Sequence, residues 1–171
     1  MIDATDSELR AGLEAALSVR RWVTELASIA PFESLDELLD AARIAATPLD
    51  QGEIDEAMAH HPRIGERPVG TGTAAEHSRR EQASLNHGHD VDADDAELSA
   101  AIHAGNVAYE ARFERVFLIR AAGRTRAEIL AELTRRLALD EATELAIVGE
   151  QLRAIALLRL AATFGSKEDS L

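Results

Sequence analysis

Residues 125–163 read TRAEILAELTRRLALDEATELAIVGEQLRAIALLRLAAT, and this stretch decides the fold. Thr125 and Glu128 have the spacing of a capping box, which predicts a helix that ends at about Leu139. Asp140 is a favoured N-cap residue and predicts a second helix that runs to about Thr163. Alanine, leucine, glutamate and arginine fill both segments, and these residues favour helix. The stretch therefore predicts two consecutive helices.

The rest of the chain shows the same signals. The sequence predicts further helices at residues 5–17, around 22–26, 34–47, 50–60, 74–86 and 93–112. Residues 61–73 contain prolines and glycines and are predicted to form a loop, and residues 117–121 are predicted to form a short connecting segment. We therefore expect an all-α, single-domain bundle of about eight helices over residues 1–171, with a flexible tail at about 165–171.

Composition excludes several classes of function. The chain has no cysteine, which excludes disulfides, thiolate zinc sites and cysteine nucleophiles. Its formal charge of −13 repels nucleic-acid phosphates and anionic membrane surfaces. No segment approaches the roughly 20 apolar residues that span a bilayer, and the first residues lack a signal-peptide pattern. We expect a cytoplasmic protein that binds neither nucleic acid nor membranes.

The loop at residues 61–73 and the polar helix after it hold the candidate chemistry. Ser78, Glu81 and Gln82 stand at i, i+3 and i+4, so their side chains share one helix face. His61 precedes a proline at a predicted helix end. By spacing alone, the polar face is more typical of a solvated surface, and the His-Pro pair of a turn.

Several short motifs occur in a characteristic order. His61-Pro62-Arg63-Ile64-Gly65 is followed by Ser78-x-x-Glu81-Gln82. The others are Trp22-Val23, Pro31-Phe32-x-Ser34-Leu35, Asn106-x-x-Tyr109-x-x-x-Phe113, Gly123-Arg124-Thr125-x-x-Glu128-Ile129-Leu130, Ala142-Thr143-Glu144 and Ile155-x-x-Leu158-Arg159-Leu160. Their order and spacing resemble those of the decarboxylases of 2-oxo-4-hydroxy-4-carboxy-5-ureidoimidazoline (OHCU). One segment departs from the family pattern, because Glu114-Arg115-Val116 interrupts an F-G-F-P-F-like turn.

The resemblance implies a function and a site. Family members are all-α homodimers without a metal or an organic cofactor. They are carbon–carbon lyases that convert the small molecule OHCU to (S)-allantoin, the last step from urate to allantoin in purine catabolism. The residues that match the family's catalytic positions are His61 and Glu81. The matching substrate-binding residues are Pro62, Ser78, Gln82, Phe117, Leu118, Ile119, Arg120, Ala121 and Arg159.

Other interpretations stay open at this point. The same scaffold is compatible with a related ureido or imidazoline acid as substrate, and the departure at Glu114 to Val116 is where such a shift is expected. A non-enzymatic acidic helical module that binds a partner protein is compatible with the composition alone. A metal enzyme is disfavoured, because no His-Glu-x-x-His helix occurs and Asp95 replaces the glycine of a calcium loop that starts at Asp90.

Overall fold

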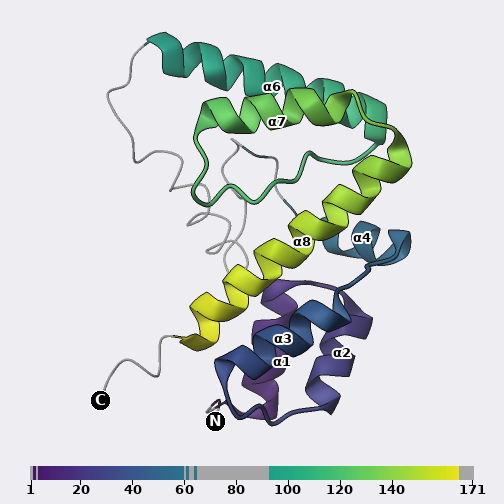
Figure 1. The fold of residues 1–171 in the computed structure, drawn as a ribbon, viewed down its shortest axis with the longest axis vertical. Helices are drawn as coiled ribbons and strands as arrows, with labels where there is room; N and C mark the ends of the chain where they lie inside the picture. Colours follow the sequence, from purple (N-terminus) through teal and green to yellow (C-terminus); the bar gives the residue numbers. More distant parts are fainter. Residues whose placement is uncertain (1, 3, 60, 62–63, 65–92, 166–171) are drawn as a thin grey trace. The chain divides into compact units, whose positions relative to one another are not determined.

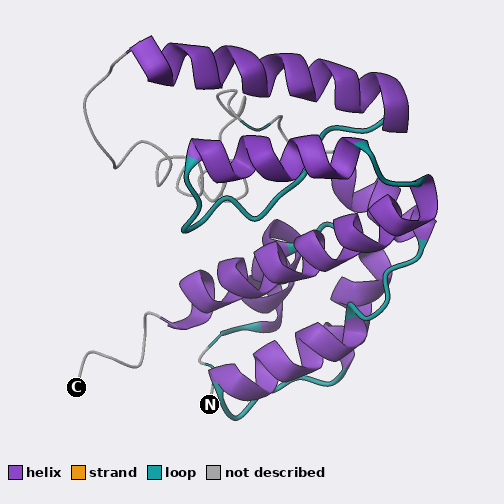
Figure 2. Cartoon of the chain, turned by 45° about the horizontal axis from the view of Figure 1, so that its top comes forward, coloured by secondary structure: helices purple, strands orange, loops and turns teal. Residues whose placement is uncertain are grey.

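The computed structural model describes residues 2, 4–59, 61, 64 and 93–165 of the chain. Every regular element among these residues is an α-helix, as Figures 1 and 2 show. The helices are α1 (Asp6–Ala16), α2 (Arg20–Ser28), α3 (Leu35–Ala45), α4 (Gln51–Met58), α6 (Ala93–Phe113), α7 (Arg126–Leu137) and α8 (Glu141–Phe164). The all-α prediction is confirmed. In the described part of the chain, no helix is both long and apolar enough to cross a membrane.

Capping residues start most of these helices, as the sequence predicted. Thr5 and Thr125 each accept a hydrogen bond from a backbone N–H, and the glutamates of both boxes bond back to the cap. Ser34 accepts from the N–H of Glu37, but the Glu37 carboxylate accepts from Glu33 N rather than from Ser34, so this box is half formed. Asp140 caps α8 through a 2.9 Å bond from Thr143 N.

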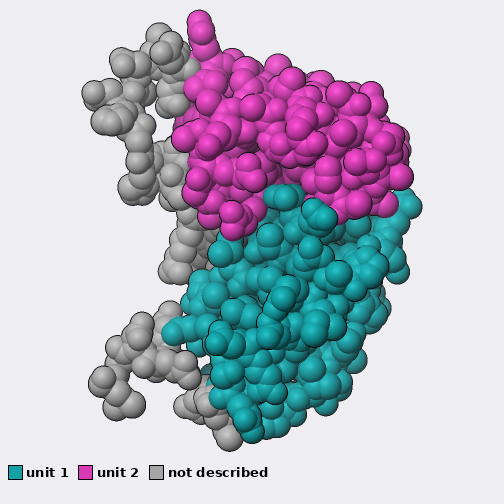
Figure 3. All heavy atoms as spheres, viewed as in Figure 1, with its two compact units in different colours: residues 1–59, 149–171 teal, residues 60–148 magenta. Residues whose placement is uncertain are grey.

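The chain divides into two compact units, which Figure 3 colours separately. Unit 1 comprises residues 1–59 and 149–171, and unit 2 comprises residues 60–148. The 24-residue helix α8 begins in unit 2 and ends in unit 1. One domain over residues 1–171 stays a prediction, and the predicted tail lies outside the described residues except for Gly165.

Unit 1 packs α1–α4 and the second part of α8 around an apolar core. Its largest fully buried side chain is Trp22, whose indole N–H donates to the carbonyl of Ala42 at 3.0 Å, so the aromatic body is buried while its polar atom is satisfied. Arg153 of α8 donates to Thr47 Oγ1 at 3.0 Å.

Unit 2 is built on α6 and α7, which lie side by side in Figures 1 and 2. A close approach is possible because Gly105 has no Cβ: a methyl group there would overlap Cδ2 of Leu133 and lie 3.1 Å from its Cγ. We call the buried apolar cluster of this unit the unit 2 core. It contains Ile64, Ile102, Tyr109, Phe113, Phe117, Ile119, Ala121, Ile129 and Leu133.

Candidate functional site

His61 follows α4 and is half buried. Three residues later, Ile64 is buried in the unit 2 core, and its carbonyl accepts a 3.0 Å hydrogen bond from the side-chain amide of Asn106. Three residues of chain span at most about 11 Å, so this anchor limits how far the His61 backbone can move from α6. The histidine thus belongs to a loop that is fastened to unit 2 close by.

Four of the predicted site residues lie outside the described residues. They are Pro62, Ser78, Glu81 and Gln82. The convergence of Ser78, Glu81 and Gln82 on one helix face stays a prediction.

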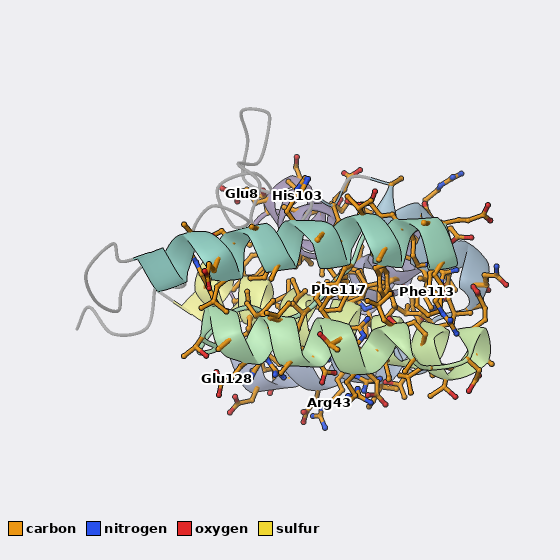
Figure 4. The ribbon with its side chains drawn as sticks, turned by 90° about the horizontal axis from the view of Figure 1, so that it is seen from above. Glu8, Arg43, His103, Phe113, Phe117 and Glu128 are labelled. Carbon is orange, nitrogen blue, oxygen red and sulfur yellow. The ribbon has the colours of Figure 1, made fainter. Side chains whose placement is uncertain are left out.

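The predicted substrate-contacting segment, Phe117–Ala121, connects α6 to α7 and has no regular secondary structure. The side chains of Phe117, Leu118, Ile119 and Ala121 are buried, and only Arg120 is exposed. Figure 4 shows Phe113 and Phe117 between the ribbons of α6 and α7. Because four of its five side chains are buried, the segment can offer a ligand mainly its backbone groups.

The departure from the family pattern lies just before this segment. Glu114 ends α6 with φ of 54°, in the left-handed region, and its N–H donates to the carbonyl of Glu110 at 2.9 Å. This is a helix end that glycine usually makes, because a Cβ is disfavoured at such angles. Arg115 pairs with Glu141 of α8 at 2.9 Å. The chain therefore makes the turn with a residue other than the glycine of the family pattern.

Tyr109, Arg136 and Glu144 form a buried polar cluster in unit 2, and all three are 0% exposed. The Nε of Arg136 donates to both carboxylate oxygens of Glu144, at 2.9 and 3.0 Å, and Nη2 donates to Oε1. The hydroxyl of Tyr109 donates to the same Oε1. Burial and then the bond to Glu144 raise the pKa of Tyr109, so the hydroxyl stays protonated as a donor.

The remaining edge of Arg136 contacts the Phe117–Ala121 segment. Nη1 donates to the carbonyl of Leu118 at 2.7 Å. The guanidinium carbon lies 4.7 Å from the centroid of the Phe117 ring, within the range of a cation–π contact. The buried polar cluster therefore holds the predicted substrate-contacting segment at two successive residues.

Arg136 was not predicted from the sequence. A signal was present, because Ile129, Leu133 and Arg136 stand at i, i+4 and i+7, so the arginine falls on the apolar stripe of α7. A cation at such a position needs a buried anion. Glu144 and Tyr109 belong to the motifs that carry the resemblance, and both are fully buried.

Arg159 is 5% exposed and lies on the part of α8 that belongs to unit 1. His61 and the Phe117–Ala121 segment belong to unit 2. The convergence of Arg159 with them stays a prediction. A cavity of about 250 Å³ in unit 1 is lined by Leu9, Ala27, Phe32 and their neighbours, and none of the predicted site residues that the structure describes lines it.

Comparison with known proteins identifies the family. The sequence model of the OHCU decarboxylase family matches residues 3–161. The chain belongs to the OHCU decarboxylase family. A relative from Haloferax volcanii, named 2-oxo-4-hydroxy-4-carboxy-5-ureidoimidazoline decarboxylase, is 31% identical over 147 residues, which are 85% of this chain and 83% of the relative. Family membership, predicted from the motifs, is confirmed.

Two solved structures share the fold of this OHCU decarboxylase family member. A crystal structure of OHCU decarboxylase in the presence of (S)-allantoin superposes with a TM-score of 0.73 at 23% identity. The match covers 95% of this chain and 99% of the solved chain. A crystal structure of (S)-allantoin synthase gives a TM-score of 0.63 at 17% identity, and covers 95% of this chain and 52% of that one. The family match spans His61, the Phe117–Ala121 segment and Arg159 alike.

Proposed function

We propose that this protein is a cofactor-independent decarboxylase that converts OHCU to (S)-allantoin in the breakdown of urate. The observation that carries the proposal is the family match over residues 3–161. The ordered motifs from Trp22 to Leu160 support it independently of any single residue.

The substrate explains why such a reaction needs little from the protein. The carbon that loses carbon dioxide carries a hydroxyl and lies next to a C=N bond, which accepts the electron pair of the broken C–C bond. A proton must then reach one face of the neighbouring ring carbon, which formed that C=N bond, to give a single enantiomer. The protein therefore has to orient the carboxylate and move protons, and binding in a fixed geometry supplies much of the rate.

In this proposal His61 is the general acid/base, because an imidazole exchanges protons near neutral pH. Its half-buried position is compatible with that role. Glu81 assists by positioning the substrate hydroxyl and ureido nitrogens or by tuning His61. Ser78 and Gln82 hydrogen-bond ring and ureido groups, and Pro62 shapes the pocket wall.

Arg159 binds the substrate carboxylate or a carbonyl oxygen in this proposal. A guanidinium presents a planar pair of donors to such groups, and charge-assisted bonds are strong where water is scarce. The 5% exposure of Arg159 supports such a setting. Backbone groups of the Phe117–Ala121 segment contact the ring.

A coupled assay tests the reaction. Urate is oxidised and 5-hydroxyisourate hydrolysed in situ, and the decay of OHCU is followed together with the circular dichroism of allantoin, with and without this protein. We expect faster decay and accumulation of optically active (S)-allantoin. Unchanged decay to racemic allantoin by folded protein would refute the proposal.

The role of His61 is tested by His61→Ala in the same assay. Loss of a general acid/base typically slows catalysis by about 10²- to 10⁴-fold, so turnover should nearly vanish. His103→Ala is the matched control, because His103 is exposed on α6, and it should retain wild-type turnover. Equal turnover in both variants would contradict the assignment.

A related ureido or imidazoline acid is the second candidate substrate. The observation that favours it is Glu114, which adopts the left-handed conformation directly before the segment proposed to contact the ring. If the protein turned over such an acid but not OHCU under the same conditions, this acid would replace OHCU as the proposed substrate.

We also propose that the two units form one domain, and that the protein is a cytoplasmic homodimer.

The proposed dimer rests on the family resemblance, and an exposed apolar face on α6 supports it. On this face Val107 is 51% exposed, and it lies beside exposed Ala100, Ala104, Ala108 and Ala111. Sedimentation analysis should give twice the chain mass of 18.5 kDa. Val107→Glu should then shift the protein toward monomer, and a monomeric wild type would contradict the proposal.

A further inference from the structure

Buried charges in unit 2 have no part in the chemistry proposed above. Tyr109, Arg136 and Glu144 are fully buried, and none of them is among the residues to which the resemblance assigns catalysis or substrate binding. Replacement of a buried ion pair by well-packed apolar residues is often neutral or stabilising. Stability alone therefore does not explain why a carboxylate, a guanidinium and a phenol meet here.

We propose that Arg136 is a positioning residue that fixes the Leu118 carbonyl, and through it the Phe117–Ala121 segment, in the orientation that binds substrate. Glu144 and Tyr109 hold Arg136 in place. This inference rests on the proposed function, because the orientation of the segment affects turnover only if the segment contacts the substrate.

The geometry of the guanidinium carries the first step. Arg136 directs Nε and Nη2 to Glu144 and Nη1 to the Leu118 carbonyl, 2.7 Å away. The guanidinium is planar and rigid, so when Glu144 holds Nε and Nη2, the direction of Nη1 is fixed as well. Glu144 is itself held by the hydroxyl of Tyr109 from α6.

The irregular backbone of the segment carries the second step. Residues 116–121 belong to no helix or strand, so no regular hydrogen-bond ladder holds their carbonyls. A buried carbonyl needs a donor, and for Leu118 that donor is Arg136. The guanidinium also lies 4.7 Å from the Phe117 ring centroid, so it contacts two consecutive residues of the segment. Loss of this contact should let the segment shift, because no helix or strand hydrogen bonds hold its backbone.

Arg136→Lys is the variant that tests the proposal. Lysine keeps a positive charge near Glu144, but one ammonium group cannot reproduce the fixed fork that reaches both Glu144 and Leu118. Arg135→Lys is the matched control on the same helix, because the Arg135 side chain is 53% exposed and pairs with Glu132 within α7. Both variants are assayed with OHCU, and kcat is normalised to the folded fraction from circular dichroism.

We expect Arg136→Lys to raise KM by about 10- to 100-fold, as small misplacements of binding groups do. Arg135→Lys should leave KM and kcat unchanged. A merely structural role for Arg136 would reduce the folded fraction and leave KM at its wild-type value, and this result would overturn the proposal.

If Arg136→Lys fails to fold, Tyr109→Phe carries the test. This variant removes one hydroxyl and keeps the ring, which lies 4.7 Å from that of Phe113 and 5.2 Å from that of Phe117. Loss of one hydrogen bond to the carboxylate should raise KM by about 2- to 10-fold. An unchanged KM refutes the proposal.

Hydrogen exchange separates this inference from the proposed function. If the wild type does not turn over OHCU, the proposed function fails, and exchange of the amides of residues 118–121 decides the positioning role alone. Faster exchange there in Arg136→Lys (or in Tyr109→Phe if that variant carries the test), relative to the amides of α6, supports the role. Equal exchange in wild type and variant refutes it.

Discussion

Glu114 holds the backbone at φ of 54°, an angle that costs a residue with a Cβ roughly 1–2 kcal/mol. Glu114→Gly should therefore stabilise the protein by about 0.5–1 kcal/mol, since glycine's greater freedom in the unfolded chain offsets part of the relief. Urea unfolding followed by circular dichroism measures the change. Glu97→Gly, at an exposed position inside α6, is the control and should destabilise by about 1 kcal/mol. If both variants destabilise equally, the strain assigned to Glu114 is wrong.

Single residues also show how far the site was predictable. His61 and the Phe117–Ala121 segment were predicted as site residues from the family resemblance, and their roles stay predictions. Arg136 was missed because its partners are 8 and 27 residues away along the chain, in Glu144 and Tyr109. A single polar residue in an apolar stripe was the available signal, and its partner can be identified only once helices pack.

Among the elements, α6 and α7 depend on a glycine for their close packing. Gly105→Ala would push a methyl group into Leu133, which is 0% exposed and has little room to move. We expect a net loss of about 1–2 kcal/mol, because overpacking outweighs the gain of about 1 kcal/mol in helix propensity. Thermal unfolding of the variant measures this.

Gly149→Ala in α8 is the matched control for Gly105→Ala. A Cβ at position 149 would lie 3.5 Å from Cδ1 of Ile54, which is ordinary van der Waals contact. It should stabilise by up to about 1 kcal/mol through helix propensity. Stabilisation by both substitutions would show that Gly105 is not needed for the approach of α6 to α7.

Elements were the best predicted level of this structure. Six of the described helices begin within three residues of a predicted start, because capping residues such as Thr5, Asp50 and Thr125 act on their own first turn. α2 lacks a side-chain cap bond, and no capping residue marks its start in the sequence. The half-formed box at Ser34 shows the limit of such signals, because the Glu37 carboxylate accepts from the N–H of Glu33 instead of that of Ser34.

At the scale of the whole molecule, the formal charge of −13 should oppose folding through self-repulsion. An increase of NaCl from about 20 mM to about 500 mM shortens the Debye length and should raise Tm by a few degrees. Exposed pairs such as Arg10–Asp6 weaken in salt but contribute little. Equimolar KCl should give the same rise. A fall in Tm with both salts would mean that attractive pairs outweigh the net repulsion.

At this scale, the division of the chain into two units could not be predicted from the sequence. The all-α class follows from composition and caps, whereas the division into units depends on contacts between distant segments. The return of the chain from unit 2 to unit 1 inside α8 leaves no mark in the sequence, because Val148 and Gly149 are ordinary interior positions of one helix. Tertiary packing alone determines this boundary.

The path of α8 also sets an order for folding during synthesis. Helices α1–α4 leave the ribosome first, but the segment that completes their unit, from Gly149 onward, leaves after all of unit 2. Unit 2 is one continuous stretch, so its contacts become available as a block. Until the end of α8 emerges, the nascent N-terminal helices keep uncovered the apolar surface that α8 will bury. This interval is when the growing chain is most exposed to aggregation and most in need of a chaperone.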